Sequence, residues 1–338
     1  MAVLFWVLVG FATVSCLFMA WSLGANSNSP PFAPAIGANA VSTMRAAFLV
    51  GILAAAGAVA QGGAISETVG AALIDGVSIT PLAASAGLLV AAAFMMFGVY
   101  SGYPVPAAFA TTGAILAHVR MGVIPHPTRS EGSVSEAVSL ALGRPTVLGI
   151  DVLAIVVTLV FAAVAFRAIR RRTQTSVENG IRTFLLVLGG VVAFSSGGSQ
   201  VGLATGPLEN LYGVELGLPG IVLLVIGATG ILAGAWMGAP RLLQATSREY
   251  AQLGPRRSIA ALVPGFIIAQ LAIALGIPIS FNNIIISGVI GGGLAAGSAG
   301  VSRRKIGVTI AFWILTLGTS IGLGFGLYRL VSSLLGIQ

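Results

Sequence analysis

The sequence predicts an all-α polytopic membrane protein made of two inverted-topology repeats, with broken or re-entrant helices and about 10 membrane segments. Three observations predict this fold. Of the 338 residues, 57% are hydrophobic and only 8% are charged. Segments rich in glycine, proline and polar residues recur at one spacing in the two halves of the chain. The basic residues cluster in short loops between apolar runs, as expected for a multi-pass protein of the cell membrane.

Apolar runs suited to crossing a membrane occur along the whole chain. Soluble domains carry about a quarter charged residues, so most of this surface must face something other than water. A helix needs roughly 20 apolar residues to cross about 30 Å of hydrocarbon. The runs that approach or reach this length cover residues 1–23, 46–60, 82–100, 147–168, 221–237, 259–275 and 306–335. The first run lacks the basic start and the cleavage site of a signal peptide, so we expect it to be a membrane helix.

The net charge of +8 could suggest nucleic acid as a partner. The basic residues lie in short loops between apolar runs, however, where they are better explained as determinants of membrane topology. We therefore expect a small inorganic anion and the lipid bilayer as partners, and no nucleic acid. The one cysteine, Cys16, lies in the first apolar run and is expected to be buried in an apolar role.

Three landmarks recur in the two halves of the chain. Residues 24–27 (GANS) match 197–200 (GGSQ) and Pro34 matches Pro207 at an offset of 173 residues, while 102–106 (GYPVP) match 276–280 (GIPIS) at 174. A nearly constant offset predicts an internal duplication. We expect a first transmembrane repeat over residues 1–166, a basic cytoplasmic connection over 167–182 and a second transmembrane repeat over 183–338.

The charges of the second half predict its orientation. The strongest basic cluster of the chain is expected in the cytoplasm, and it comprises Arg167, Arg170, Arg171, Arg172 and Arg182. From there the chain leads out to a loop with Glu209 and Glu215. It returns to basic clusters within residues 241–257 and 303–305, which are again expected inside.

The matching loops of the first half carry the opposite signs. The loop 62–81 holds Glu67 and Asp75 without Lys or Arg, whereas Arg45 follows the loop 27–42. This reversal predicts that the two repeats cross the membrane in opposite directions. The loop 117–144 fits less well, because it is expected outside and yet holds Arg120, Arg129 and Arg144.

The two polar breaks have the composition of an anion site. In many transporters with inverted repeats, half-helices meet near the middle of the membrane and point their positive N-termini at an anionic substrate. Residues 24–34 contain two Asn, two Ser and three Pro, and residues 197–207 contain four Gly with Ser199, Gln200 and Thr205. Pro104 and Pro278 each begin a new helical run, where the amides that follow can face a ligand.

At these positions the chain resembles the inorganic phosphate transporter (PiT) family, whose relatives include sulfate permeases. The family carries Gly-Ala-Asn-Asp-Val-Ala-Asn in each half and Pro-Val-Ser-Thr-Thr-His later in each half. Here the first signature reads GANSNSP at 24–30, and its second copy reads AFSSGGSQ at 193–200. The later motifs read PVPAAF at 104–109 and PISFNN at 278–283. Residues 66–70 (SETVG) also look like a family segment, so the resemblance spans essentially the whole chain with degenerate motifs.

The resemblance implies which residues bind the substrate and its coupling ion. In the family, the signature Asp residues help to hold sodium, and the Ser and Thr residues of the later motif help to hold phosphate. Both Asp positions are neutral here, Ser27 and Gln200, so H⁺ and Na⁺ both stay open as the coupling ion, and no other cofactor is expected. The residues expected to bind substrate or ion are Asn26, Ser27, Asn28, Ser199, Gln200, Ser280, Asn282 and Asn283.

No catalytic residues and no metal site are expected. Catalysis needs paired carboxylates, a metal cluster or a nucleophile beside a base, and the apolar spans offer none of these. His118 and His126 lack a Cys or acidic partner at ligand spacing. Glu67 falls in a loop and is expected to be solvated or interfacial rather than a buried proton carrier.

The sequence therefore predicts a secondary transporter, or permease, of inorganic phosphate that works by alternating access and is coupled to an ion. Sulfate or another small anion is the alternative substrate, and a passive anion channel is the alternative mechanism. A structural or sensory role is a further alternative, and an enzyme is not expected. The oligomeric state stays open, with a homodimer as the assembly to test.

Overall fold

The computed structural model is all-α in the residues that it describes, which confirms the predicted class. These are residues 2–67, 69, 80–120, 156, 160, 178–275, 279–295 and 301–336. Within them every regular element is a helix, and β-type pairing is limited to one bridge between Ala251 and Val301. Several features discussed above lie outside the described residues: Thr68, Gly70, Asp75, His126, Arg129, Arg144, Pro278 and the part of the basic connection that covers 167–177.

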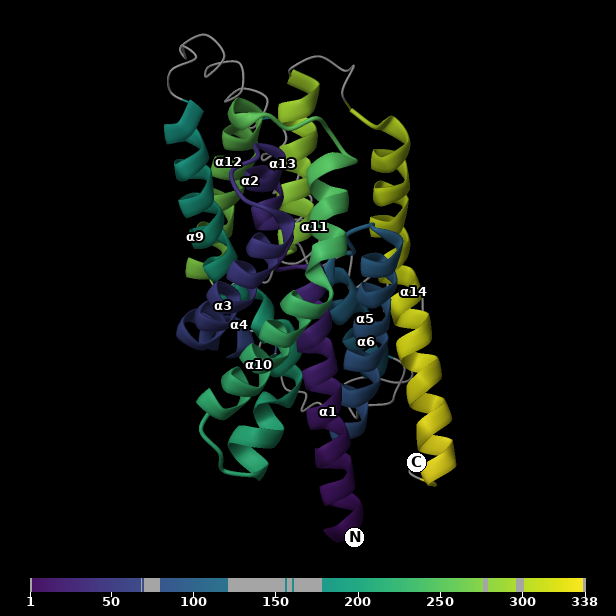
Figure 1. The fold of residues 1–338 in the computed structure, drawn as a ribbon. Helices are drawn as coiled ribbons and strands as arrows, with labels where there is room; N and C mark the ends of the chain where they lie inside the picture. Colours follow the sequence, from purple (N-terminus) through teal and green to yellow (C-terminus); the bar gives the residue numbers. More distant parts are fainter. Residues whose placement is uncertain are drawn as a thin grey trace.

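The first half of the chain forms a bundle of long helices joined by short ones (Figure 1). Its elements are α1 (Ala2–Asn26), η1 (Pro30–Phe32), α2 (Ala33–Gly37), α3 (Thr43–Gln61), α4 (Gly63–Glu67), α5 (Pro81–Ser101) and α6 (Ala107–Arg120).

The second half follows a similar order of long and short helices. Its elements are α9 (Glu178–Thr205), η5 (Gly206–Leu208), the π-helical η6 (Leu211–Glu215), α10 (Ile221–Met237), α11 (Ala239–Arg248), α12 (Pro255–Ala274), α13 (Phe281–Ala295) and α14 (Arg303–Leu335). α9 passes without a break through residue 183, the expected start of the second repeat.

Five helical segments of the described residues are long and apolar enough to cross a membrane. They are Val3–Gly37, Thr43–Gln61, Pro81–Ser101, Gly180–Leu208 and Arg303–Leu334. α10 and α11 form a sixth candidate span, bent by 62°. The protein is therefore a multi-pass membrane protein, whereas the expected number of about 10 segments remains a prediction.

Local sequence signals set the ends of the helices that matter for the site. α5 begins with Pro81, and the hydroxyl of Thr80 accepts a hydrogen bond from the Ala83 amide at 3.3 Å, which caps its first turn. The same helix ends at Gly102, whose φ of 73° lies in the left-handed region that favours glycine. After α1, Pro30 and Pro31 break the main helix, since a proline offers no amide for the next turn.

The two halves pack against each other through reciprocal helix pairs. α1 of the first half packs on α10 of the second, and α3 of the first half packs on α9 of the second. Glycine lines both crossings, because a Cβ on Gly234 would overlap the Trp21 carbonyl and a Cβ on Gly57 would overlap the Phe194 carbonyl. Such small residues let membrane helices approach closely. The two halves thus share one interior rather than forming separate domains.

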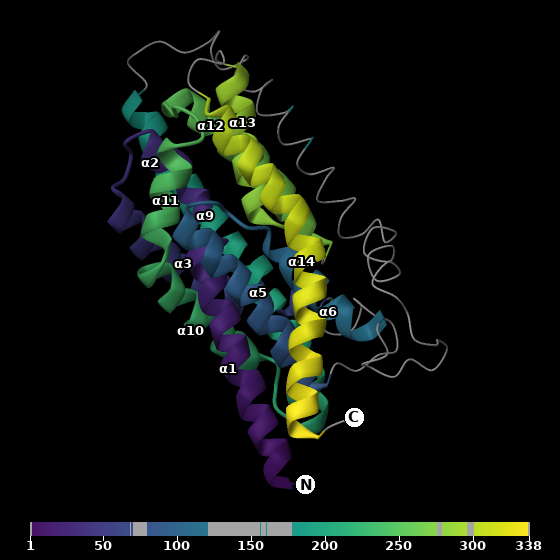
Figure 2. The same cartoon turned by 90° about the vertical axis from the view of Figure 1, so that its right-hand side faces the viewer.

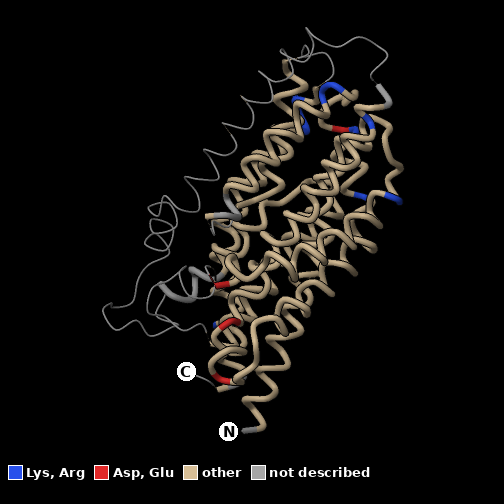
Figure 3. The backbone as a smooth tube through the Cα atoms, turned by 90° about the vertical axis from the view of Figure 1, so that its left-hand side faces the viewer, with Lys and Arg blue, Asp and Glu red and all other residues tan. Residues whose placement is uncertain are grey.

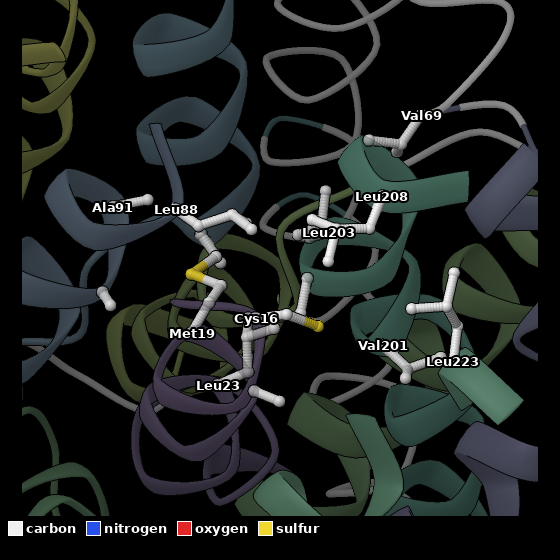
Figure 4. Packing of buried hydrophobic residues seen from close by; sticks show 14 of the residues in the cluster. Cys16, Met19, Leu23, Val69, Leu88, Ala91, Val201, Leu203, Leu208 and Leu223 are labelled. Carbon is white, nitrogen blue, oxygen red and sulfur yellow. The ribbon is translucent and has the colours of Figure 1, made fainter. Parts of the chain in front are cut away.

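The main hydrophobic core lies between α1, α5, α9 and α10. Figure 4 shows Met19 and Leu23 of α1 facing Leu88 of α5, with Leu203 of α9 close by. Cys16 lies in the same cluster, where it is fully buried and unpaired, as the sequence predicted.

Charge is distributed unevenly along the bundle. Figure 3 shows Lys and Arg gathered mainly at one end and most of the Asp and Glu at the other. The end where Lys and Arg gather is here called the basic end. α11 ends there and α14 begins there. Both termini lie at the opposite, acidic end (Figure 2). Arg45 lines a cavity with Arg248 at the basic end, and the α4 residue Ser66 contacts Glu209 at the acidic end. The first half therefore places Arg45 at the basic end and α4, with the exposed Glu67, toward the acidic end.

Candidate functional site

Two helical hairpins reach into the interior of the protein and turn there. α5 and α6 pack together as the first hairpin, and α12 and α13 as the second. Their tips are buried, with Val105 and Ala107 at 0% exposure in the first, and Ile279 and Phe281 at 0–1% in the second. The hairpins occupy equivalent places in the chain, because α5 and α12 both begin at a proline and both pairs of helix starts are 174 residues apart.

Each hairpin tip is bound by a side-chain amide from the long helix that opens its half. Asn26 of α1 donates from Nδ2 to the Val105 carbonyl at 2.8 Å, and the Val105 amide donates to Asn26 Oδ1 at 3.2 Å. Gln200 of α9 donates from Nε2 to the Ile279 carbonyl at 3.0 Å. In both pairs the partners are 79 residues apart in the chain.

These equivalent hydrogen bonds correct the sequence alignment of the two breaks by one residue. An offset of 173 had matched Gln200 with Ser27. The hydrogen bonds instead relate Gln200 to Asn26, at the offset of 174 that also relates the hairpins. Glycine and small residues fill both breaks, so the sequence alone could not distinguish the two registers.

Asn282 of α13 joins the second hairpin to the tip of the first. Its Nδ2 donates to the Val105 carbonyl at 2.7 Å, so this carbonyl accepts from both Asn26 and Asn282. The position equivalent to Asn282 in α6 is Ala108, which has no polar side chain. The first hairpin tip is therefore bound by side chains of both halves.

A further contact joins the two helix breaks. Ser196 of α9 donates to Asn28 Oδ1 at 2.5 Å, and Ser27 Oγ accepts from Asn26 Nδ2 at 3.1 Å. Ser196 was not among the expected site residues. The signal that could have identified it is its place in α9, one turn before Gln200, on the same face of the helix.

All eight residues expected to bind substrate or ion are buried, at 0–1% exposure. Bonds of four of them join the end of α1, the middle of α9 and the two hairpin tips: Asn26, Asn28, Gln200 and Asn282. Ser27 makes a local bond with Asn26. Ser280 caps α13, since its Oγ accepts from the Asn283 amide at 3.5 Å. Within the described residues, the Ser199 hydroxyl and the Asn283 side-chain amide make no hydrogen bond to this cluster.

Several of these buried polar atoms have no hydrogen-bond partner among the described residues. They are Asn28 Nδ2, Ser199 Oγ, Gln200 Oε1, Asn282 Oδ1, Asn283 Oδ1 and Asn283 Nδ2. A buried polar group without a partner costs about 1–3 kcal/mol, so atoms of this kind are commonly satisfied by water or by a ligand. Asn26, by contrast, uses both ends of its amide on the Val105 peptide. The eight residues thus divide into those that hold the hairpin tips and those with atoms free for a ligand.

The electrostatic character of the cluster comes from the backbone. None of the eight side chains carries a charge. α6 and α13 both begin at this point, with lengths of 14 and 15 residues. Their N-termini carry free amides and the positive end of the helix dipole, which favour an anion.

A second polar group, which the sequence analysis did not identify, lies at the acidic end. Ser66 donates to the Glu209 carboxylate at 2.7 Å and lies 3.0 Å from the Thr205 hydroxyl. It joins α4 of the first half to the end of α9. The neighbouring Glu67 is exposed, as expected. The side chain of His118 lies outside the description, and the described residues contain no group of three or more metal-binding side chains.

Comparison with known proteins identifies the family. The model of the phosphate transporter family matches residues 23–174 and 136–324. A Thermococcus kodakarensis protein provisionally named a phosphate permease is 24% identical over 383 residues, which cover 92% of this chain and 93% of that protein. The chloroplastic inorganic phosphate transporter 2-1 of Arabidopsis thaliana is 29% identical over 156 residues, 43% of this chain and 26% of that one. A solved structure described as the sodium-dependent phosphate transporter shares the fold, with a TM-score of 0.73 and 18% identity over 96% of this chain and 99% of that one. This chain belongs to the phosphate transporter family.

Proposed function

We propose that this protein is a secondary transporter that moves inorganic phosphate across a membrane by alternating access. One observation carries the proposal beyond family membership. Two hairpin tips and two helix breaks meet around buried polar atoms that have no partner among the described residues. An arrangement of half-helix N-termini around such atoms is suited to a small anion that must be bound and then released.

Three observations support two repeats of inverted topology, over residues 1–166 and 183–338. The hydrogen bonds of Asn26 and Gln200 are equivalent, the hairpins share one offset, and the helix pairs between the halves are reciprocal. The charge distribution supports placing the basic end, and the connection 167–182, in the cytoplasm of a cell whose plasma membrane holds the protein. Both termini would then be outside.

Neutral donors and backbone amides would bind the phosphate. Asn28 Nδ2, Ser199 Oγ and Asn283 Nδ2 are donors without a partner in the described residues, and the first turns of α6 and α13 add backbone amides. Because the eight side chains include no Lys or Arg, we expect these dipoles to supply most of the attraction for the anion. The same neutrality suits sulfate, which makes sulfate the second candidate substrate.

The proposal includes coupling to an ion gradient, with Na⁺ and H⁺ as the two candidates. Gln200 Oε1, Asn282 Oδ1 and Asn283 Oδ1 are amide oxygens without a partner among the described residues, and oxygens of this kind can hold a cation. No carboxylate is among the eight residues to balance the charge of a sodium ion. A proton is therefore the alternative driving ion.

Uptake by proteoliposomes tests the proposal. Labelled phosphate and labelled sulfate are each offered to the purified, reconstituted protein with a sodium gradient, a proton gradient or neither. Accumulation of phosphate against its gradient, driven by one of the two ions, is the expected result. Equal rates under all three conditions would instead indicate a passive channel, and uptake of neither anion would refute phosphate transport. Light scattering of the same sample tests the homodimer.

A further inference from the structure

Lys305 is a partly buried cation outside the cluster described above, and its ion-pair partner is half-exposed. It lies in the first turn of α14, at the basic end of the bundle, and its side chain is only 11% exposed. Its Nζ donates to Glu249 Oε2 at 2.6 Å. Glu249 is the residue that directly follows α11. An ammonium group that is largely removed from water needs such partners, because burying a charge without them is costly.

Lys305 also contacts the tip of the first hairpin. Its Nζ lies 3.9 Å from the centre of the Tyr103 ring, within the range of a cation–π interaction. The Tyr103 ring stacks on Phe312 with the centroids 5.4 Å apart, and Trp313 Nε1 donates to the Pro104 carbonyl at 3.1 Å. Lys305, Phe312 and Trp313 lie at positions i, i+7 and i+8 of α14, so they form one face of this helix.

The next residue after Pro104 belongs to the candidate site. The Val105 peptide is the one held by Asn26 and Asn282. One short segment, 103–105, is therefore held from two sides. Lys305, Phe312 and Trp313 of α14 hold it from the basic end, and Glu249 acts only through Lys305. The amide side chains hold the segment from the anion site. A movement of this tip toward or away from the basic end would have to change both sets of contacts.

We propose that Lys305 is a positioning residue for transport, which with Glu249 and Tyr103 holds the first hairpin tip in place and closes the path between the anion site and the basic end. Tyr103 comes from the hairpin of the first half, Lys305 from α14 of the second half, and Glu249 is the residue that follows α11. Alternating access requires the contacts that close one side to break when that side opens. This inference rests on the proposed function, since it assigns a gate to the same site.

The test measures access to the anion site from the basic end. A reporter cysteine replaces the fully buried Ala108 in a Cys16→Ala background, and a membrane-impermeant maleimide is supplied from one side of the membrane at a time. Glu249→Gln and Lys305→Met remove the ion pair. An exposed or half-exposed pair contributes up to about 1 kcal/mol, so we expect labelling from the basic end to rise about fivefold in both variants. Labelling from the acidic end should not rise.

Two matched variants separate a gate from a general loss of stability. Lys305→Arg keeps a cation that can bond the Glu249 carboxylate and lie over the Tyr103 ring, so its labelling rate should stay closer to that of the parent than the rates of Glu249→Gln and Lys305→Met. Arg303→Gln removes an exposed charge from the same turn of α14 and should also leave labelling unchanged. The inference is overturned if labelling does not rise in Glu249→Gln and Lys305→Met, or if it rises equally in Arg303→Gln. If the parent protein takes up no phosphate and the variants still gain labelling, the proposed substrate fails while the gate stands.

Discussion

Replacing Asn26 by alanine should destabilise the protein more than replacing Asn282, although both side chains contact the same carbonyl. In the described residues the Val105 amide donates to Asn26 Oδ1 alone, so Asn26→Ala leaves a buried N–H without its partner. The Val105 carbonyl would keep its bond from Asn282. One orphaned buried donor costs about 1–3 kcal/mol, and we expect a loss of about 2 kcal/mol in unfolding free energy.

Asn282→Ala leaves the same peptide satisfied. The Val105 carbonyl keeps its bond from Asn26, and the substitution also removes Asn282 Oδ1, which has no partner among the described residues. The net loss is one neutral hydrogen bond, offset in part by the removal of an unsatisfied oxygen, so we expect about 1 kcal/mol or less. Phosphate uptake should fall in both variants, since each loses a contact that places the first hairpin tip.

Unfolding in mixed detergent and SDS micelles, followed by tryptophan fluorescence without phosphate, measures the difference. Ser22→Ala is the matched control. Its hydroxyl is buried in α1 and, among the described residues, bonds only the Phe18 carbonyl of the same helix, at 2.9 Å, so its loss should change stability by less than about 0.5 kcal/mol. If Asn282→Ala proves as destabilising as Asn26→Ala, the assignment of an orphaned amide is wrong.

Three further substitutions, one of them with a matched control, test other parts of the structure. Gly57→Ala places a methyl group against a backbone carbonyl of α9, so over-packing should cost about 1–3 kcal/mol and outweigh the gain in helix propensity. Gly10→Ala is the control, because a methyl group there has open space and should leave the unfolding free energy unchanged or raise it in the same assay. Asn283→Ala removes two polar atoms that lack partners, so it should leave stability without phosphate unchanged and abolish the stabilisation that added phosphate gives. Ser196→Ala removes the donor to Asn28 Oδ1 and should lower the unfolding free energy by about 1–2 kcal/mol.

Composition and landmarks were sufficient to predict the helical membrane fold and the hairpins. The runs of apolar residues require helices, and the glycine and proline landmarks at 102–106 and 276–280 mark where the hairpins turn. The same signals predicted the burial of all eight polar residues, because polar side chains within membrane segments almost always face the interior of the helix bundle.

The roles of the individual polar atoms could not be predicted from the sequence. Helices that are apolar on every side give no amphipathic pattern from which to read the inward face. The sequence therefore did not show that Asn282 reaches across to the other half, nor that Ser196 bonds Asn28. Aligning the two breaks on their glycines displaced the register by one residue. The feature that the two halves share is the hydrogen bond from a side-chain amide to a hairpin tip, made by Asn26 and by Gln200, and the glycines lie at a different spacing from it.

The exchanged packing of α1 on α10 and of α3 on α9 has a consequence for how the chain assembles. The first half by itself leaves faces of α1 and α3 uncovered, since these faces pack closely on α10 and α9, which are made later. During synthesis the first half would enter the membrane before α9 and α10 have been made, and its helices would be only loosely associated until then. Two fragments cut between α6 and α9 should accordingly be degraded when made singly and should recover a functional protein when made together, as in a two-chain complex.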